Sequence, residues 1–164
     1  MRRILLPNVL SETMIEECRI HLEEGIHRGG PWDVYPIDHL VEVIREHVPI
    51  KLGRKSYWNL ECMSKGHDWH YDGCELDFEP NHMAWCQWSA VTLLSPPDEF
   101  EGGEFQFWDD DDEGSNAPQS LREELYRSLL IYPSGADNDP LLHQATPHTN
   151  GERWMLLMFF EGED

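Results

Sequence analysis

The feature that most constrains the fold is a change in the character of the sequence after Pro49. From there on, short segments rich in aromatic and β-branched residues alternate with clusters of Gly, Pro, Asn and Asp, which is typical of an all-β sandwich or barrel. Strands are predicted at residues 57–63, 85–94, 104–108, 129–132, 143–145 and 153–160. The last of these lacks a clean alternation of apolar and polar residues, so we expect a central strand buried on both faces.

Two helices are predicted ahead of Pro49. Between Ser11 and Gly25 the apolar residues recur at helical spacing, Ser11 suits the N-cap, and Gly25 suits a left-handed stop. A second apolar stripe predicts a helix over residues 38–48, which Pro49 ends. The sequence therefore predicts a mainly β fold, a double-stranded β-helix (jelly roll) with N-terminal supporting helices.

The length of 164 residues suits one domain with its own hydrophobic core. We expect a single domain over residues 1–164, with a helical support region at 1–50 and the jelly-roll core at 51–164. Residues 109–113 are a block of acidic charge and residues 135–140 a polar turn cluster, so both are expected to be loops. Residues 120–127 are expected to add one or two helical turns.

The formal charge of −20, from 32 acidic and 12 basic residues, excludes a surface that tracks phosphates, and we expect no nucleic-acid partner. The charge fits a solvated acidic surface, which we favour, or the attraction of a cationic substrate or basic peptide. No window has the eighteen apolar residues of a membrane span, and the apolar stretch after Met1 is too short for a secretion signal. We therefore expect a cytoplasmic protein without membrane contact, as a monomer or a dimer.

Four cysteines are far fewer than a secreted disulfide scaffold carries, and we expect them to be reduced. Cys62, Cys74 and Cys86 have histidines nearby, which raises a zinc site as an alternative. The close Cys pairs of zinc fingers and ribbons are absent, which disfavours it.

The sequence His70-Tyr71-Asp72 carries the strongest chemical signal, together with His143 some seventy residues later. Residues i and i+2 of a strand point to one face, so His70 and Asp72 can bind one metal ion. His143 on a neighbouring strand would complete three ligands. Two imidazoles and one carboxylate leave three coordination positions open, the arrangement of non-haem iron(II) oxygenases. By itself the short motif is weak evidence, because nine histidines and many aspartates produce it by chance.

Several blocks in order strengthen this reading, and together they resemble the prolyl 4-hydroxylase-like branch of the Fe(II)- and 2-oxoglutarate-dependent dioxygenases, including the PKHD-type hydroxylases. The resemblance extends over roughly residues 57–160. The blocks are Gly66 with residues 70–72, then residues 89–97, 101–105, 130–134, 143–147 and 151–153.

The resemblance implies that His70, Asp72 and His143 bind Fe(II) and that Arg153 binds the distal carboxylate of the co-substrate 2-oxoglutarate. It also implies dioxygen as a co-substrate, with ascorbate as an optional reductant, and the release of succinate and carbon dioxide. Arg153 opens a buried strand, where an unpaired guanidinium is costly, so an anionic partner is expected there. The alternative for Arg153 is a structural ion pair with an acidic residue. Because related halogenases lack the carboxylate, Asp72 favours hydroxylation.

Some features depart from the family pattern. Cys62 and Met63 stand where members often have Arg-Tyr, so a tyrosine hydroxyl near the co-substrate is missing, with Tyr57, Thr92 and Tyr132 as candidate replacements.

His148 competes with His143 as a ligand. The spacing from His143 to Pro147 and Arg153 fits the family better, so we interpret His148 as an exposed turn residue or rim contact.

The expected substrate is a prolyl, peptidyl or amino-acid-like group, whether a small molecule or part of a protein. The candidate pocket residues beside the site blocks are Trp69, His82, Trp85 and Trp108. Two other functions remain open: a cupin-type metal-binding jelly roll without a 2-oxo acid, and a catalytically silent binding module for a basic partner.

Overall fold

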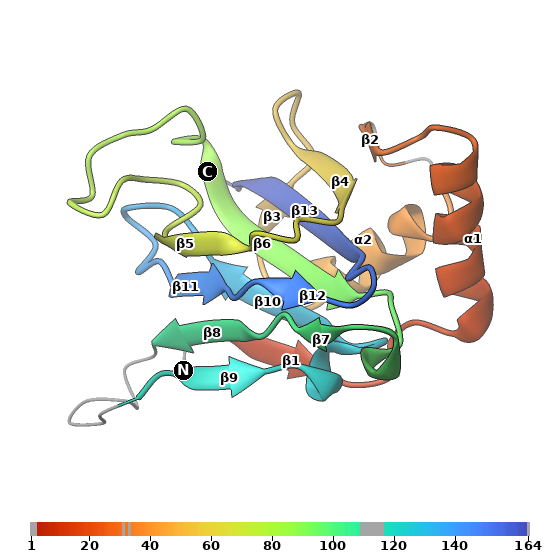
Figure 1. Ribbon diagram of the computed structural model, residues 1–164. Helices are drawn as coiled ribbons and strands as arrows, with labels where there is room; N and C mark the ends of the chain where they lie inside the picture. Colours follow the sequence, from red (N-terminus) through yellow and green to blue (C-terminus); the bar gives the residue numbers. More distant parts are fainter. Residues whose placement is uncertain (1–2, 31, 33, 109–116, 164) are drawn as a thin grey trace.

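A computed structural model describes residues 3–30, 32, 34–108 and 117–163 of the chain, with two helices on one side of two antiparallel sheets (Figure 1). The major sheet has the order β1-β10-β6-β13-β4-β2, and β3 pairs with β13. Its strands are β1 (Ile4–Leu6), β10 (Leu129–Pro133), β6 (Cys86–Leu93), β13 (Met155–Gly162), β4 (Tyr57–Glu61), β2 (Arg28–Gly29) and β3 (Ile50–Lys51). The predicted central strand is confirmed, since β13 lies between β6 and β4 and is largely buried.

The minor sheet has the order β5-β11-β8-β9, and a separate pair joins β7 to β12. The strands are β5 (His67–His70), β11 (Leu142–Ala145), β8 (Phe105–Trp108), β9 (Gln119–Leu121), β7 (Glu101–Gly102) and β12 (His148–Thr149). Short 3-10 helices occur at η1 (Pro97–Glu99) and η3 (Glu123–Leu125). The mainly β jelly-roll prediction is confirmed.

The two faces of the major sheet bury different clusters, because side chains alternate along each strand. One face packs against α1 (Glu12–Glu23) and α2 (Ile37–Arg45) through Trp58, Leu60, Ala90, Leu129, Ile131, Leu156, Met158 and Phe160. The other packs against Phe105 and Phe107 of the minor sheet through Val91, Leu93, Leu130, Tyr132 and Met155. The candidate site therefore lies on the face of the major sheet that is turned away from the helices.

Helix α1 begins as predicted. The Ser11 hydroxyl accepts a hydrogen bond from the Met14 backbone N–H at 3.1 Å, and Gly25 beyond the C-terminus has φ of 81°. Helix α2 is shorter than the predicted 38–48, because residues 46–48 form a terminal turn ahead of Pro49. Neither helix has the length and apolar composition required to cross a bilayer.

Among the loops, residues 135–140 form the predicted turn, in which Asn138 donates a backbone hydrogen bond to Gly135 at 2.9 Å. The helical prediction for residues 120–127 is confirmed in part, since the single 3-10 turn η3 lies within this segment. Residues 120 and 121 instead pair with β8 as the end of strand β9. The predicted acidic loop at 109–113 lies outside the described residues.

Candidate metal centre and active site

The structure brings His70, Asp72 and His143 together. His70 ends β5 and His143 lies in β11, and the antiparallel register sets the two histidines directly opposite each other. Asp72 Oδ1 lies 3.1 Å from His70 Nε2 and 3.2 Å from His143 Nε2. One ligand atom from each residue falls within 4.8 Å of the others, and in the described part of the chain this is the one such group. The group contains no cysteine, so among the described residues the alternative of a cysteine-based zinc site finds no support.

Backbone carbonyls orient both imidazoles. The carbonyl of Asp68 lies 2.6 Å from His70 Nδ1, and that of Leu141 lies 2.9 Å from His143 Nδ1. A carbonyl only accepts hydrogen bonds, so each Nδ1 carries a proton. Each Nε2 then either carries a second proton, which it donates to Asp72 Oδ1, or in the neutral ring has a lone pair that can bind a cation. Two nitrogen lone pairs and a carboxylate oxygen directed at one point suit a cation.

Two hydroxyls fix the Asp72 carboxylate. Ser89 Oγ donates to Asp72 Oδ2 at 2.8 Å, and Tyr132 Oη donates to the same oxygen at 2.9 Å. Oδ1 is thereby left facing the histidines. Neither hydroxyl was predicted in this role: Tyr132 was a candidate for the co-substrate end, and Ser89 was not singled out. The signal that could have found them is strand alternation, which sets Ser89 and Tyr132 on the same face of the major sheet as Val91 and Leu130.

The electrostatics of the cluster follow from burial and close charges. Burial alone would raise the pKa of Asp72, yet His143 and His70 hold that pKa well below its usual value. Burial would lower the pKa of His70, but the hydrogen bond and charge of Asp72 raise it overall. Burial and the nearby Asp72 charge raise the pKa of Tyr132 well above its usual value, so its hydroxyl stays a donor. The carboxylate therefore remains ionised and fully oriented.

Arg153 lies two residues before the start of β13 and is 6% exposed. Its Nε is buried without a hydrogen-bond partner, and no described residue forms an ion pair with its guanidinium. Burial lowers the pKa of Arg153 to about 10. The charge of Glu61 acts in the opposite direction to burial and favours the charged form. No described carboxylate contacts the guanidinium directly, so this buried cation lacks the close partner that its charge requires.

A cavity of about 550 Å³ connects the two features: His70, Asp72 and His143 line it, and so does Arg153. Val91, Met155 and Leu157 of the major sheet add apolar wall between them. The rim is formed partly by the loop of residues 71–85 between β5 and β6. The cavity thus presents a cluster of possible metal ligands at one place and a buried guanidinium at another, separated by an apolar wall.

The structure separates the other predicted pocket residues into two groups. Trp69, His82 and Tyr57 line the cavity. Trp85 and Trp108 do not, and each instead packs on an aromatic residue of the wall.

Thr92 cannot replace the missing tyrosine hydroxyl. It pairs with Leu156, so its side chain lies on the helix-facing side of the major sheet.

The interpretation of His148 as an exposed turn residue is wrong. His148 is 4% exposed, because β12 pairs with β7 and turns the ring inward against Phe100. Its Nε2 accepts a hydrogen bond from the Arg153 backbone N–H at 3.4 Å and lies 3.7 Å from Cys62 Sγ. His148 thus supports the backbone of Arg153 and lies outside the cluster of possible metal ligands.

A model described as the 2OG-Fe(II) oxygenase superfamily matches residues 58–161. A PKHD-type hydroxylase of Shewanella sp. (strain ANA-3) is 37% identical over 73 residues, which are 44% of this chain and 28% of that protein. The matched region thus spans little more than a quarter of that relative.

Two solved structures share the fold. A prolyl-4-hydroxylase of Pseudomonas putida has a TM-score of 0.66 at 16% identity, covering 98% of this chain and 88% of that one. The viral collagen prolyl hydroxylase of Paramecium Bursaria Chlorella virus-1, in a 2OG complex, has a TM-score of 0.67 at 14% identity, covering 100% and 97%. At such identities the likeness concerns the fold alone.

Proposed function

Because the chain belongs to the 2OG-Fe(II) oxygenase superfamily, we propose that it is a hydroxylase in which His70, Asp72 and His143 bind Fe(II) and Arg153 binds the distal carboxylate of 2-oxoglutarate. The observation that carries this proposal is that one cavity is lined both by a cluster of metal-ligand atoms and by a buried guanidinium without a described partner. A dicarboxylate that reaches from the metal to Arg153 satisfies both ends.

The donor set fits the proposed metal. Two imidazole nitrogens and one carboxylate oxygen are the ligands of non-haem Fe(II) oxygenases, and they leave positions open for other molecules. When bound, Fe(II), 2-oxoglutarate and dioxygen supply the oxidising chemistry, in which succinate and carbon dioxide are released and a substrate C–H bond is hydroxylated.

The chain's own residues hold and shield these reactants. Ser89 and Tyr132 hold the Asp72 carboxylate so that Oδ1 faces the histidines. Val91 and Leu157 exclude water from the path toward Arg153, which strengthens the contact between its guanidinium and a carboxylate. These contributions are positioning and electrostatics, while the bond-breaking chemistry belongs to the cofactor.

We further propose a peptidyl or amino-acid-like substrate. Support comes from the names of the relatives, which are a PKHD-type hydroxylase and prolyl hydroxylases. The aromatic side chains of Trp69 and Tyr57 at the cavity wall are suited to pack on a ring or an aliphatic chain.

The test is a thermal melt of the metal-free protein with Mn(II), with N-oxalylglycine as an unreactive 2-oxo acid analogue, and with both. Joint stabilisation beyond that of Mn(II) alone is expected. Stabilisation by Mn(II) alone would indicate a cupin-type metal site, and stabilisation by neither a silent binding module. His70→Ala should abolish the joint effect while the far-ultraviolet circular dichroism spectrum stays the same, and retained turnover in this variant would refute the ligand assignment.

A further inference from the structure

We infer that the substrate carries a cationic group, an amine or a guanidinium, and that Glu75 binds it. This inference rests on the proposed function and names the substrate class of the same site. Arg153 marks the cavity as a ligand site, because it is buried and lacks a described partner. The other residues that line the cavity indicate which class of substrate binds there.

The charges in the loaded cavity point to a cation. A divalent metal ion and Arg153 are balanced by Asp72 and a dicarboxylate co-substrate. Among the described residues of the wall, the remaining carboxylates are those of Glu61 and Glu75, and none of these residues is a lysine. An anionic substrate would meet uncompensated negative charge there, whereas a cationic one would neutralise it.

The two glutamates differ in availability. Glu61 contacts the Nε2 of His67, whose imidazole satisfies it. No described residue forms a hydrogen bond or an ion pair with the Glu75 carboxylate. Glu75 is also exposed, so it can meet an incoming molecule, and it is therefore the residue to which we assign the contact.

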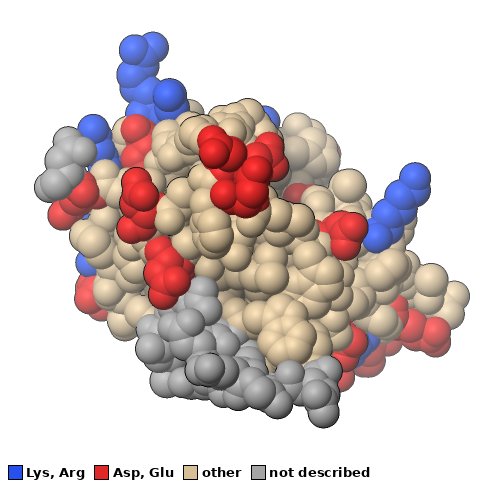
Figure 2. Space-filling model, turned by 90° about the vertical axis from the view of Figure 1, so that its left-hand side faces the viewer, with Lys and Arg blue, Asp and Glu red and all other residues tan. Residues whose placement is uncertain are grey.

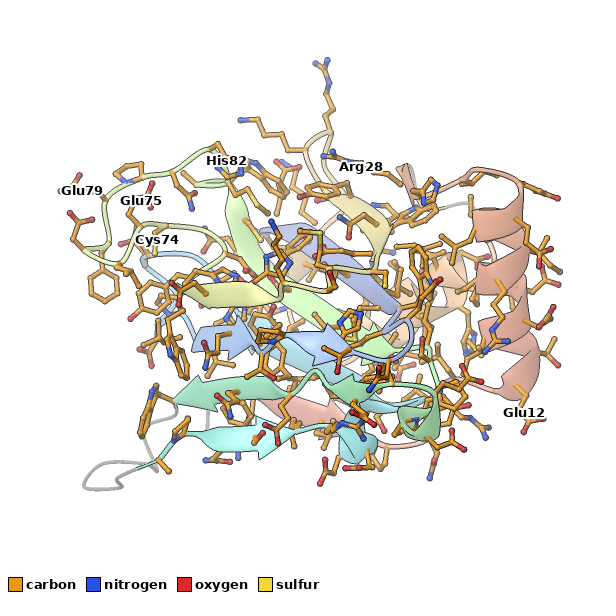
Figure 3. The ribbon with its side chains drawn as sticks, viewed as in Figure 1. Glu12, Arg28, Cys74, Glu75, Glu79 and His82 are labelled. Carbon is orange, nitrogen blue, oxygen red and sulfur yellow. The ribbon has the colours of Figure 1, made fainter. Side chains whose placement is uncertain are left out.

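The backbone around Glu75 is held in place, which makes a defined contact possible. Glu75 donates its N–H to the Glu79 carbonyl at 2.9 Å and accepts from the Phe78 N–H at 2.9 Å. Asn81 ties the same loop to the Asp72 carbonyl at 3.2 Å. Figure 3 shows Cys74, Glu75 and Glu79 on this loop at one end of the molecule, beside the strands that carry the cluster.

The surroundings suit a cation as well. Trp69 lines the same cavity, and the face of an indole ring attracts ammonium and guanidinium groups. The ring of Tyr57, also in the wall, already lies 4.1 Å from the guanidinium carbon of Arg28. Figure 2 shows the molecule from the left-hand side of Figure 1. On this face, acidic side chains lie around the centre and basic ones lie toward the edge. Such a field favours the approach of cations.

The experiment measures succinate formation by the Fe(II)-loaded protein. Substrates are short Gly/Ala peptides with one variable central residue, and the corresponding free amino acids, so that the two sources of a cation are distinguished. A Lys or Arg member is expected to stimulate turnover at least about tenfold more than any neutral or acidic member, and Nε-acetylation of Lys should abolish its advantage. Stimulation that is greatest with a neutral or acidic member, equal with the acetylated peptide, or absent throughout would overturn the inference.

Two matched variants locate the contact. Glu75→Gln should raise the KM for the basic substrate about tenfold or more and leave the KM for a neutral one unchanged. Glu79→Gln removes one charge from the same loop outside the cavity lining and should change the KM less than twofold. Equal effects of the two variants would refute the role of Glu75.

Melting with Mn(II) and N-oxalylglycine is measured for each variant as well. Normal loading without preference for basic substrates refutes the inference and leaves the proposed function standing, whereas failure of the wild type to load refutes both.

Discussion

Replacing Arg153 by Met is expected to stabilise the metal-free protein while abolishing its response to the co-substrate. Burial lowers the pKa of Arg153 by more than two units, to about 10. That difference corresponds to about 3 kcal/mol of unfavourable free energy for keeping the guanidinium charged in the fold. The cost applies at every pH below about 10, and it is relieved as the pH rises from there toward the ordinary pKa of an arginine. Met keeps an unbranched chain of similar length without the charge.

The assay is a pair of melting curves for each protein, without additions and with Mn(II) plus N-oxalylglycine. Up to about 3 kcal/mol in a chain of this size raises the Tm of the unloaded Arg153→Met variant by several degrees. The loaded variant should gain nothing from N-oxalylglycine beyond the effect of Mn(II). The variant therefore has the higher Tm without ligands, and the wild type has the higher Tm with them. A variant that melts several degrees below the wild type without ligands would refute the reasoning.

Arg122→Met provides the matched control for that comparison. Arg122 donates to the carbonyls of Gly102, Pro97 and Phe100 at 2.7–2.9 Å, so its guanidinium is satisfied by the fold. Its removal leaves acceptors without donors and should lower the Tm. The two Arg→Met changes are therefore expected to shift the Tm in opposite directions. A rise in Tm indicates a guanidinium whose role is to bind a ligand, and a fall indicates one that stabilises the fold.

Three further predictions concern the same site. Tyr132→Phe removes one of the two hydroxyls that hold Asp72 and should weaken Mn(II) binding by roughly 10–100-fold in a calorimetric titration, and unchanged affinity would contradict the orienting role. Gly103→Ala sets a Cβ 2.5 Å from Arg153 Cδ at φ of 68° and should raise the KM for 2-oxoglutarate more than it lowers kcat. Gly25→Ala, at φ of 81° with nothing within 4 Å, is its control for strain. Because the pKa of Arg153 is about 10, kcat/KM for 2-oxoglutarate should not respond to this group up to pH 9 and should fall above about pH 10; an unchanged value at pH 11 would contradict it.

The sequence predicted the long strands of the major sheet because their burial appears directly in their composition. Residues 85–94 were predicted and β6 spans Cys86–Leu93, and residues 129–132 were predicted where β10 spans Leu129–Pro133. The short strands β2, β3, β7 and β12 have two residues each, which is too few for a periodic pattern. Whether such segments pair depends on a partner strand distant in sequence.

The error at His148 has the same origin. The sequence Pro147-His148-Thr149-Asn150-Gly151 has the composition of a turn. Pairing with β7 nevertheless buries the ring, and that pairing joins residues 101–102 to 148–149. The local composition therefore predicts a turn in the backbone, but it does not predict that the neighbouring strand buries the side chain of His148.

The grouping of His70, Asp72 and His143 was easier to predict than the residues that support it, and the sheets explain why. His70 and Asp72 are close in sequence, and His143 needs only one strand pairing to reach them. Ser89 and Tyr132 belong to the major sheet, so their contact with Asp72 depends on how the two sheets pack together. Phe105 contacts residues of both sheets. Its ring stacks on that of His143 with the centroids 5.2 Å apart, and its centroid lies 5.9 Å from that of Tyr132.

The co-substrate end depends on the same packing. Arg153 enters from the major sheet, whereas the metal cluster is anchored in the minor one. A molecule that binds Arg153 and the metal together would therefore be held between the two sheets and would add to the contacts that join them. Its binding energy then stabilises the arrangement on which the Asp72 hydrogen bonds depend, which couples loading of the co-substrate to the order of the metal site.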